Sequence, residues 1–231
     1  DATLLHLGPG FANAMSFLHN ARKAGAPVVN IVGDHATSHS QYSQAPLTSD
    51  IMAICGGVSD WLHQSRSADE VAGDGARCIQ AARQAPGQIA TLVLPADCAW
   101  NEASTPARPL PVAPPGAIDG AVIERVAAAL KNGKKTALLM RGRCLERAGL
   151  EATGRIAAAS GARLFHDYFT PRMTRGEGLP EVERVPYFAE DIVEFLKGLE
   201  QIVLVGAPPP LANLLAACAA SLALPATAQP A

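Results

Sequence analysis

One stretch near the start of the chain decides its fold: Leu4-Leu5-His6-Leu7-Gly8-Pro9-Gly10-Phe11-Ala12-Asn13-Ala14-Met15. The pattern predicts a short buried strand, a glycine-proline turn and the start of a helix. Glycines allow the backbone to approach a ligand closely, and the free N–H groups of a first helical turn favour negative charge. The same pattern also fits an ordinary strand-to-helix turn, so the residues alone leave both interpretations open.

The residues that follow complete a βαβ unit. Apolar residues recur at helical spacing over 11–24, and Gly25 is a typical helix stop. A buried strand is predicted next, at 27–32. A strand, a helix and a strand with short connections imply a parallel sheet with a right-handed crossover. Ligands of such sheets bind beyond the carboxyl ends of the strands, where His6 and Asp34 both fall.

The first half of the chain continues with alternating elements. We expect a polar loop at 36–46, a short helix at 47–55, a strand at 58–63, a helix at 67–85 and a strand at 89–95. The polar loop is longer than an ordinary connector, which predicts either a functional or a mobile loop. His35 and His39 are expected to stabilise this loop or to lie at the surface.

Both predicted helices carry capping signals. Thr48 or Ser49 is the expected cap of the short helix. Ser67, followed three residues later by Glu70, has the spacing of a capping box at the start of the longer helix.

A proline-rich segment divides the chain. Residues 103–117 hold five prolines, which make a segment stiff and extended, so we interpret it as an interdomain linker. Beyond it, helices are predicted at 118–132, 145–160, 189–198 and 211–222, and strands at 136–140, 163–167 and 201–205. The predicted fold class is therefore α/β. Two doubly wound parallel-sheet domains, 1–102 and an incomplete 118–231, are joined by that linker.

Composition and charge exclude several classes of function. A formal net charge of -2 gives no electrostatic basis for binding nucleic acid or an anionic membrane. Charged residues recur too often for a membrane-spanning run of about 20 apolar residues. The five cysteines are far apart and show no metal-ligand spacing, and no signal segment precedes the first strand. We therefore expect reduced, mostly buried thiols, no metal site and a cytoplasmic protein.

The chain resembles the pyrimidine-binding domain of a known superfamily in three features. These are the opening motif, the strand that ends in Gly33-Asp34, and the later Asp50. This superfamily is the thiamine diphosphate-dependent superfamily of acetolactate synthase and benzoylformate decarboxylase. The linker and the second α/β domain are similar to the family's central domain. The resemblance implies thiamine diphosphate and magnesium as cofactors and a 2-keto acid as substrate. It also implies decarboxylation or carboligation as the reaction, and a homo-oligomer.

The resemblance assigns roles to residues of the opening motif. His6 matches an active-site histidine that transfers protons to substrate-derived intermediates, a role that suits an imidazole. The alternative is a histidine that caps the turn. Gly8, Gly10 and Asn13 match the turn and first helical turn beside the pyrimidine of the cofactor. Asp34 stands where relatives often have Gln, and it is the fourth cofactor-binding candidate.

One further pattern imitates the magnesium-diphosphate motif of this family. In the family, Gly-Asp-Gly follows an apolar strand, where a carboxylate and loop carbonyls can reach the metal. Here Gly73-Asp74-Gly75 lies inside a predicted helix, whose apolar face continues through Ala76 and Ile79. No metal site is therefore predicted from it.

The resemblance covers two of the family's three domains, and only the later part of the first. The catalytic glutamate would precede the first strand, and the diphosphate-binding domain would follow residue 231. The chain also opens at Asp1 without a Met, so we expect a fragment that is inactive by itself. Two alternatives stay open. One is a non-catalytic interaction module that pairs with other chains, and the other is a nucleotide-binding module, for which no Gly-rich fingerprint follows the later strands.

Overall fold

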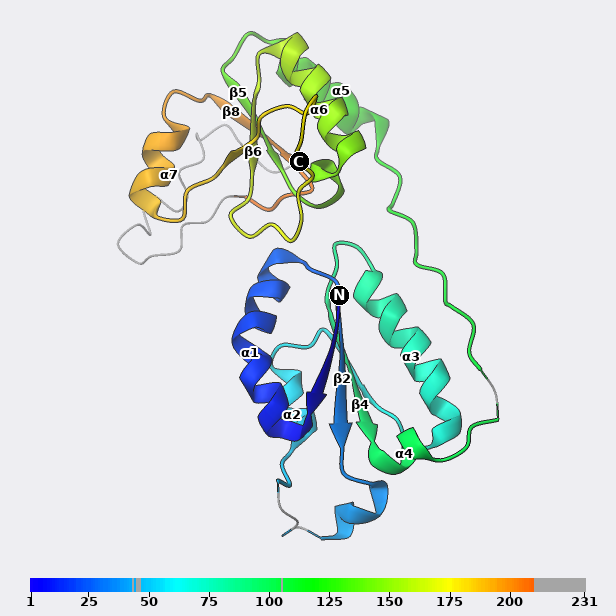
Figure 1. Ribbon diagram of the computed structural model, residues 1–231. Coiled ribbons are helices and arrows are strands. Elements are labelled where there is room, and N and C mark those ends of the chain that lie inside the picture. The colour runs from blue at the N-terminus through cyan, green and yellow to red at the C-terminus, as the bar shows by residue number, and fades with distance from the viewer. Residues whose placement is uncertain (43, 45–46, 105, 210–231) are drawn as a thin grey trace. The chain divides into compact units, whose positions relative to one another are not determined.

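The computed structural model describes residues 1–209 of the chain except 43, 45–46 and 105 (Figure 1). The helix predicted at 211–222 and Cys218 lie outside the described residues. Contacts between residues divide the chain into two compact units, Asp1–Pro115 and Gly116–Ala231. Each unit is built on its own four-stranded sheet, so the predicted α/β class with two parallel sheets is confirmed.

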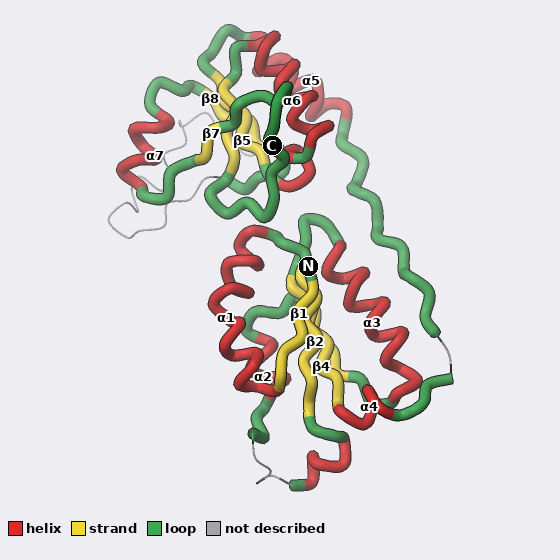
Figure 2. The backbone as a smooth tube through the Cα atoms, viewed as in Figure 1, coloured by secondary structure: helices red, strands yellow, loops and turns green. Residues whose placement is uncertain are grey.

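All four strands of the first unit are parallel and lie in the order β1-β2-β4-β3. They are β1 (Ala2–His6), β2 (Val28–Asp34), β3 (Trp61–Gln64) and β4 (Ile89–Pro95). Helices α1 (Leu7–Ala24) and α2 (Ile51–Gly56) pack on one face of the sheet, and α3 (Ala68–Arg83) packs on the other (Figure 2). A short 3-10 helix, η1 (Thr37–Gln41), follows β2, and α4 (Ala96–Trp100) follows β4.

Two apolar cores hold these helices on the sheet. Phe11 of α1 is fully buried and belongs to the same core as Val32 and Val93 from the two central strands. On the opposite face, Cys78 of α3 is buried together with Leu92. Each such side chain contributes about 1.5–3 kcal/mol when it is fully removed from water. The alternation of apolar side chains along β4 is what allows one strand to serve both cores.

A chain of side-chain hydrogen bonds crosses the first sheet. Thr3 Oγ1 donates to Asn30 Oδ1 at 2.7 Å, and Asn30 Nδ2 donates to Thr91 Oγ1 at 3.1 Å. Thr91 Oγ1 also lies 2.7 Å from Ser59 Oγ. Asn30 and Thr91 are both fully buried. A slip of one residue between strands would separate these partners inside the core, so the chain of bonds secures the register.

The opening strand is parallel as predicted, but the prediction that it is buried is wrong. β1 pairs with β2 and has no second neighbour among the described residues, so it is an edge strand. Thr3 and Leu5 are half-buried, whereas Ala2, Leu4 and His6 are exposed. Leu4 is 81% exposed. A strand at an edge buries only the side chains that a helix covers, and α1 covers one face of this strand.

The glycine-proline segment is not a turn before the helix. α1 begins at Leu7, so Gly8-Pro9-Gly10 forms its first turn. Pro9 is tolerated there because the N–H groups of a first turn have no partner inside the helix. The reversal of the chain is made by Leu7, a buried residue with a φ of 55°. The predicted stop at Gly25 is confirmed, since Gly25 has a left-handed φ of 67°.

The caps of the next two helices differ from the predicted ones. Asp50 caps α2, because its carboxylate accepts a hydrogen bond from the Ala53 N–H at 2.9 Å, and the two preceding residues do not have this role. Ser67 is the N-cap residue of α3, but its side chain makes no cap hydrogen bond. Glu70 accepts from the N–H of Arg66 at 3.2 Å. The capping box is therefore incomplete, because Glu70 binds the N–H of Arg66, the residue before Ser67.

The Gly-Asp-Gly segment lies inside α3, as predicted, but the buried face of that helix is different. Ile79 is 50% exposed and does not continue the apolar face. The buried positions include Asp74, Cys78 and Ala82, which are spaced one helical turn apart. A carboxylate therefore occupies a buried position of α3, which the sequence analysis did not predict.

The second unit also has a fully parallel sheet, in the order β7-β6-β5-β8. Its strands are β5 (Thr136–Met140), β6 (Arg163–His166), β7 (Glu183–Arg184) and β8 (Gln201–Val205). Its helices are α5 (Gly120–Lys131), α6 (Arg147–Ser160) and α7 (Ala189–Leu196), with a 3-10 helix, η2 (Gly142–Leu145), before α6. α6 and α7 belong to different cores on the two faces of the sheet. β7 is an additional strand inside a segment predicted to be irregular.

Two contacts fasten the proline-rich segment to the first unit. The N–H and hydroxyl of Ser104 donate to Asp69 Oδ1 at 2.7 and 2.8 Å. Further along, Gln80 Nε2 donates to the carbonyl of Pro111 at 2.6 Å. Asp69, the acceptor of the first contact, and Gln80, the donor of the second, both belong to α3. The segment up to Pro115 accordingly belongs to the first unit.

Most of the described cysteines are buried, as predicted. Cys55, Cys78 and Cys98 are buried and Cys144 is half-buried, and all four are free thiols. Burial raises the pKa of Cys55 and of Cys78 to about 12. Among the described residues, no helix is long and apolar enough to cross a membrane.

Gly8→Ala should destabilise the first unit. A Cβ atom at Gly8 would clash with Ser49 Oγ and would lie 3.2 Å from Ile54 Cδ1. We expect a loss of about 1–2 kcal/mol, because overpacking costs about 1–3 kcal/mol and alanine regains about 0.5–1 kcal/mol in a helix. Urea unfolding followed by tryptophan fluorescence measures the first unit alone, since Trp61 and Trp100 are the chain's two tryptophans.

Gly10→Ala is the matched control, because a Cβ atom at Gly10 would lie an ordinary 3.5 Å from the Cβ atom of His6. This variant should be at least as stable as the parent chain. Equal stability of Gly8→Ala and Gly10→Ala would contradict the packing argument.

The two most deeply buried thiols should be unreactive in the native protein. In a chain that carries Cys98→Ser, Cys144→Ser and Cys218→Ser, we expect a disulfide reagent at pH 8 to modify Cys55 and Cys78 only after denaturant is added. The thiolate is the reactive form, and a pKa of about 12 leaves almost none of it at that pH. Rapid labelling of folded protein would show that these thiols are accessible.

Candidate functional site

The carboxyl edge of the first sheet gathers polar side chains from all four strands. His6 ends β1 opposite Gly33, and Asp34 ends β2 opposite Pro95. Gln64 ends β3, and Asp97 is the second residue after β4. Because the strands are parallel, their carboxyl ends meet at one edge, which is where ligands of such sheets bind. The register places His6 and Asp34 at neighbouring positions along it.

His6 is exposed and its ring is free to bind a ligand. It is the last residue of β1 and the N-cap residue of α1, with φ -105° and ψ 109°. Its side chain makes no cap hydrogen bond, so the alternative of a turn-capping histidine is wrong. No hydrogen bond or ion pair engages the ring within the part of the chain that the structure describes.

The other residues of the opening motif lie in three different environments. Gly8 is buried and packs against Ser49, so its lack of a side chain serves packing inside the unit. Gly10 lies beside His6 at the edge of the sheet. Asn13 is exposed on α1, six residues and about 9 Å of helix rise beyond Leu7. The structure therefore brings Gly10 next to His6 and places Asn13 further back along the helix.

Asp34 is held in place by two neutral donors. Its Oδ1 accepts from the N–H of His35 at 2.7 Å, and its Oδ2 accepts a long hydrogen bond from Gln64 Nε2 at 3.4 Å. The second contact connects the ends of β2 and β3. Asp34 is half-buried, so it can present a carboxylate to a ligand only from this fixed position.

A hydrogen-bonded clamp holds the start of the polar loop that follows β2. Asp97 accepts from the N–H of Thr37 at 2.9 Å and from its hydroxyl at 2.5 Å. Ring contacts connect His35 to His39, with centroids 5.4 Å apart, and His39 to Tyr42, with centroids 6.5 Å apart. These contacts agree with a loop-stabilising role for both histidines.

Sequence reasoning missed Gln64, Asp97 and Thr37. A signal was available for Asp97, which is the second residue after a correctly predicted buried strand and so was expected at the same edge. Gln64 was harder to find, because the predicted strand ended one residue before it.

Comparisons with known proteins identify relatives of this chain. A family model described as thiamine pyrophosphate enzyme, N-terminal TPP binding domain, matches residues 2–54. IlvX of Mycobacterium tuberculosis, a candidate acetolactate synthase large subunit, is 43% identical over 211 residues, which cover 91% of this chain and 40% of that protein. The chain belongs to the thiamine diphosphate-dependent enzyme superfamily. The predicted family is therefore confirmed.

Solved structures show the same fold. A thiamine diphosphate-dependent 4-hydroxybenzoylformate decarboxylase of Rhodococcus jostii RHA1 matches 93% of this chain and 42% of its own, with a TM-score of 0.76 and 20% identity. A candidate thiamin diphosphate-dependent enzyme from Mycobacterium smegmatis matches 88% of this chain and 39% of its own, with a TM-score of 0.68 and 21% identity. The chain thus spans about 40% of the length of the relatives that it matches.

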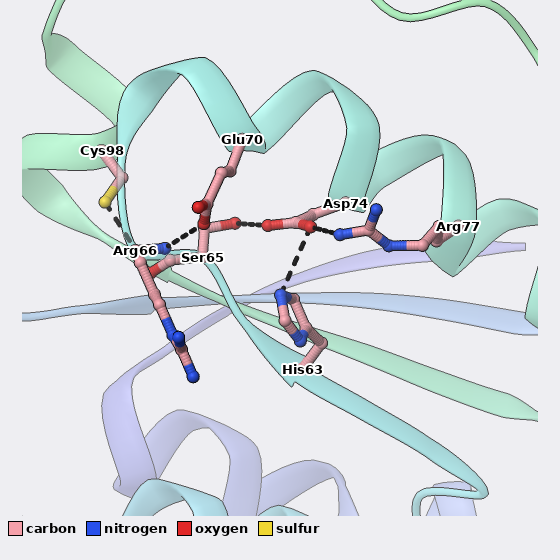
Figure 3. Close-up of polar contacts among 7 residues, drawn as sticks. All are labelled: His63, Ser65, Arg66, Glu70, Asp74, Arg77 and Cys98. Atoms are coloured by element: carbon pink, nitrogen blue, oxygen red, sulfur yellow. Dashed lines mark hydrogen bonds and ion pairs between the residues drawn. The ribbon is translucent and has the colours of Figure 1, made fainter.

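The Gly-Asp-Gly segment does not form the family's metal motif here. Asp74 is fully buried between α3 and β3, and Ser65 Oγ donates to its Oδ2 at 2.8 Å (Figure 3). Its Oδ1 pairs with Arg77 and lies 3.3 Å from His63 Nε2. Within the described part of the chain, no group of three or more His, Cys, Asp or Glu residues could hold a metal ion.

The carboxyl edge of the second sheet carries a buried histidine. His166 Nδ1 lies 2.8 Å from the carbonyl of Asp167 and 3.3 Å from Thr170 Oγ1. Asp167 in turn pairs with Arg141 at 3.2 Å. Burial lowers the pKa of His166, so the ring is neutral near pH 7. Its Nε2 is buried without a hydrogen-bond partner in the described residues.

Thr37→Val should raise the pKa of Asp97. The hydroxyl and the N–H of Thr37 hold the pKa of this carboxyl below its ordinary value of 3.8. A lowered folded-state pKa stabilises the fold at every pH above the unfolded value, and this contribution is lost as the pH falls through the folded value. We expect carboxyl-carbon NMR titration of Thr37→Val to move the pKa of Asp97 toward 3.8.

Asp69 provides the internal control for this titration, because hydrogen bonds from Ser104 lower its pKa in the same way. Its titration should be the same in Thr37→Val as in the parent chain. An unchanged Asp97 titration in this variant would show that the clamp does not form in solution.

Proposed function

We propose that this chain forms the pyrimidine-binding and central parts of a thiamine diphosphate-dependent enzyme that acts on a 2-keto acid. One observation carries the proposal: the ring of His6 is exposed at the carboxyl edge of a parallel sheet, makes no hydrogen bond with a described residue, and lies inside the segment that the family model matches. The names of two relatives support the reaction class, since one is a candidate acetolactate synthase and one acts on 4-hydroxybenzoylformate, a 2-keto acid.

The polar groups at this edge fit the pyrimidine end of the cofactor. An aminopyrimidine has N–H donors and ring-nitrogen acceptors, and the edge offers the Asp34 carboxylate, the Gln64 amide and the His6 imidazole. The diphosphate end fits poorly, because Pro9 has no N–H and Gly8 is packed inside the unit. The described residues also hold no metal group. We therefore assign the pyrimidine end to this edge, and magnesium and the diphosphate to other residues.

Some residues at this edge would position the cofactor, and one would transfer protons. Bound thiamine diphosphate supplies the electron sink that such enzymes need to break the bond beside the keto group. His6 would give a proton to the reacting substrate, or take one from it, at Nε2, the ring atom farthest from the backbone. Asp34 and Gln64, which are already hydrogen-bonded to each other, would orient the pyrimidine. Gly10 leaves the space beside the His6 ring open.

We also propose that these 231 residues do not turn over substrate by themselves and that the active protein is a homo-oligomer. The chain spans about 40% of the length of its relatives. Proton transfer at His6 needs a complete cofactor held in register with the ring, and the described residues account for one end of that cofactor.

A non-catalytic module that pairs with other chains is the second candidate. β1 is an edge strand of the first sheet, and Leu4 beside His6 is 81% exposed. A strand of this kind, whose outer backbone groups face no other strand among those described, pairs readily with a strand of another chain.

His6→Ala in the full-length protein that carries this chain tests the proposed proton-transfer role. We expect kcat for 2-keto acid turnover to fall by about 10²–10⁴-fold, the usual contribution of a general acid-base group. The affinity for thiamine diphosphate, measured by calorimetry, should change by less than about threefold. His19→Ala, an exposed histidine on α1, is the control and should keep normal turnover.

Unchanged turnover in His6→Ala would exclude His6 from the reaction. Turnover by the isolated 231 residues with thiamine diphosphate and magnesium would contradict the proposal that they are inactive alone. Sedimentation velocity together with calorimetry distinguishes the second candidate, because a module that works only by pairing forms complexes but binds no thiamine diphosphate.

A further inference from the structure

A long loop, residues 167–182, connects β6 to β7 at the carboxyl edge of the second sheet. Most connections between secondary-structure elements are shorter, at about 4–6 residues. The N–H of Thr174, in the middle of this β6–β7 loop, donates to the carbonyl of Leu145 at 2.9 Å. Met173 and Leu179 are half-buried and pack against the core on the α6 side of the sheet. A small number of contacts therefore holds the middle of the loop on the unit.

His166, the last residue of β6, fixes the start of this loop. Its side chain is buried, and its Nδ1 lies 2.8 Å from the carbonyl oxygen of Asp167, the first residue of the loop. A carbonyl oxygen can only accept a hydrogen bond, so Nδ1 carries a proton. The hydroxyl of Thr170 donates to the same carbonyl at 2.8 Å. One carbonyl thus binds both the ring of His166 and the next turn of the loop.

The other ring nitrogen of His166 is a buried acceptor. A neutral imidazole carries one proton, and because that proton is on Nδ1, Nε2 has a free lone pair. Nε2 is buried, and no described residue makes a hydrogen bond with it. A second proton would turn Nε2 into the N–H donor of a buried cation that has no acceptor among the described residues. An unpaired buried charge costs far more than an unpaired neutral acceptor.

The charges around the ring also oppose a second proton. Burial lowers the pKa of His166 below its ordinary value of 6.5, and Arg175 of the loop and Arg184 of β7 lower it further. The carbonyl and the carboxylate of Asp167 act in the opposite direction. That carboxylate, however, already pairs with Arg141, after β5, at 3.2 Å. The ring is therefore neutral at pH 7, and its protonated form is unstable inside the unit.

Proton binding therefore favours a state in which the ring of His166 reaches water. There the ring has an ordinary pKa, so a falling pH shifts the equilibrium toward that state. The β6–β7 loop is the part of the surroundings that moves most easily, because β6 itself is paired with a strand on each side. Local opening of a segment with few contacts costs less free energy than unfolding of the sheet.

We propose that His166 is a pH-sensitive switch for the β6–β7 loop. The neutral ring holds the loop against the second sheet. In mildly acidic solution the ring takes up a proton at Nε2 and enters water, and the loop opens while the sheet stays folded. The proposal concerns the second unit alone and does not depend on the proposed catalytic function.

Nitrogen NMR of the imidazole tests the starting state in the 231-residue chain. His166 is the only histidine among residues 116–231, and its signals are identified by their loss in His166→Asn. At pH 7 we expect a proton on Nδ1 and none on Nε2. A protonated Nε2 at this pH would overturn the proposal, because the ring would then have no second site for the proton that opens the loop.

Amide hydrogen exchange measures the opening itself. The N–H of Thr174 reports on the loop, and the N–H of Leu138 in β5 reports on the sheet. After correction for intrinsic exchange, protection of Thr174 should fall as the pH drops below 6.5, by about tenfold per pH unit for one proton. At each pH, Thr174 should exchange at least tenfold faster than Leu138. Equal protection of the two amides would show that acid unfolds the whole unit, and this would overturn the switch.

His166→Asn removes the titrating group but keeps an N–H donor for the carbonyl of Asp167. In this variant, protection of Thr174 should no longer depend on pH between 7 and 5. His19→Asn, which replaces an exposed histidine of α1, is the matched control and should retain the pH dependence of the parent chain. Circular dichroism confirms that both variants are folded.

Two further results would overturn the proposal. One is a His166→Asn variant that retains the full pH dependence of the parent chain. The other comes from the parent chain alone and needs no variant to fold: protonation of the His166 ring, followed by nitrogen NMR, without loss of protection at Thr174.

Discussion

The first unit depends on the chain of hydrogen bonds that runs from Thr3 through Asn30 to Thr91. Both central members are fully buried, so each needs its partner to avoid an unpaired polar group in the core, which costs about 1–3 kcal/mol. This requirement holds the three strands in one register. The register in turn places His6 opposite Gly33 and Asp34 opposite Pro95, which creates the polar edge of the sheet.

Several carboxylates at this edge accept hydrogen bonds from neighbouring residues. Asp97 holds the loop that follows β2 through Thr37, and Asp34 connects the ends of two strands through Gln64. Asp74 does the same for Ser65 inside the core. In each case an acidic side chain uses the donors of its neighbours and fixes their orientation. At this edge, the exposed ring of His6 makes no hydrogen bond with a described residue and is available to a ligand.

The Gly-Asp-Gly segment shows why a short pattern needs its structural setting. In a loop after a strand, its carboxylate would face open space and could bind a metal ion. Inside α3, Asp74 faces the sheet, where Ser65, Arg77 and His63 surround it. The same three letters therefore describe a buried structural anion in this protein. The predicted helix was sufficient to exclude the metal site, but not to reveal the network.

Apart from α4 and β7, the sequence alone determined the order of the described strands and helices along the chain, the parallel sheets, the two-part division and the family, because these follow from apolar periodicity and a distinctive opening motif. Tertiary structure alone decided that β1 is an edge strand, that Leu7 makes the turn and that Gly8 serves packing against Ser49. It also decided which polar residues meet. His6, Asp34, Gln64 and Asp97 are distant in sequence, and strand pairing brings them to one edge. Local patterns report the state of a segment, whereas a site depends on contacts between segments that no local pattern records.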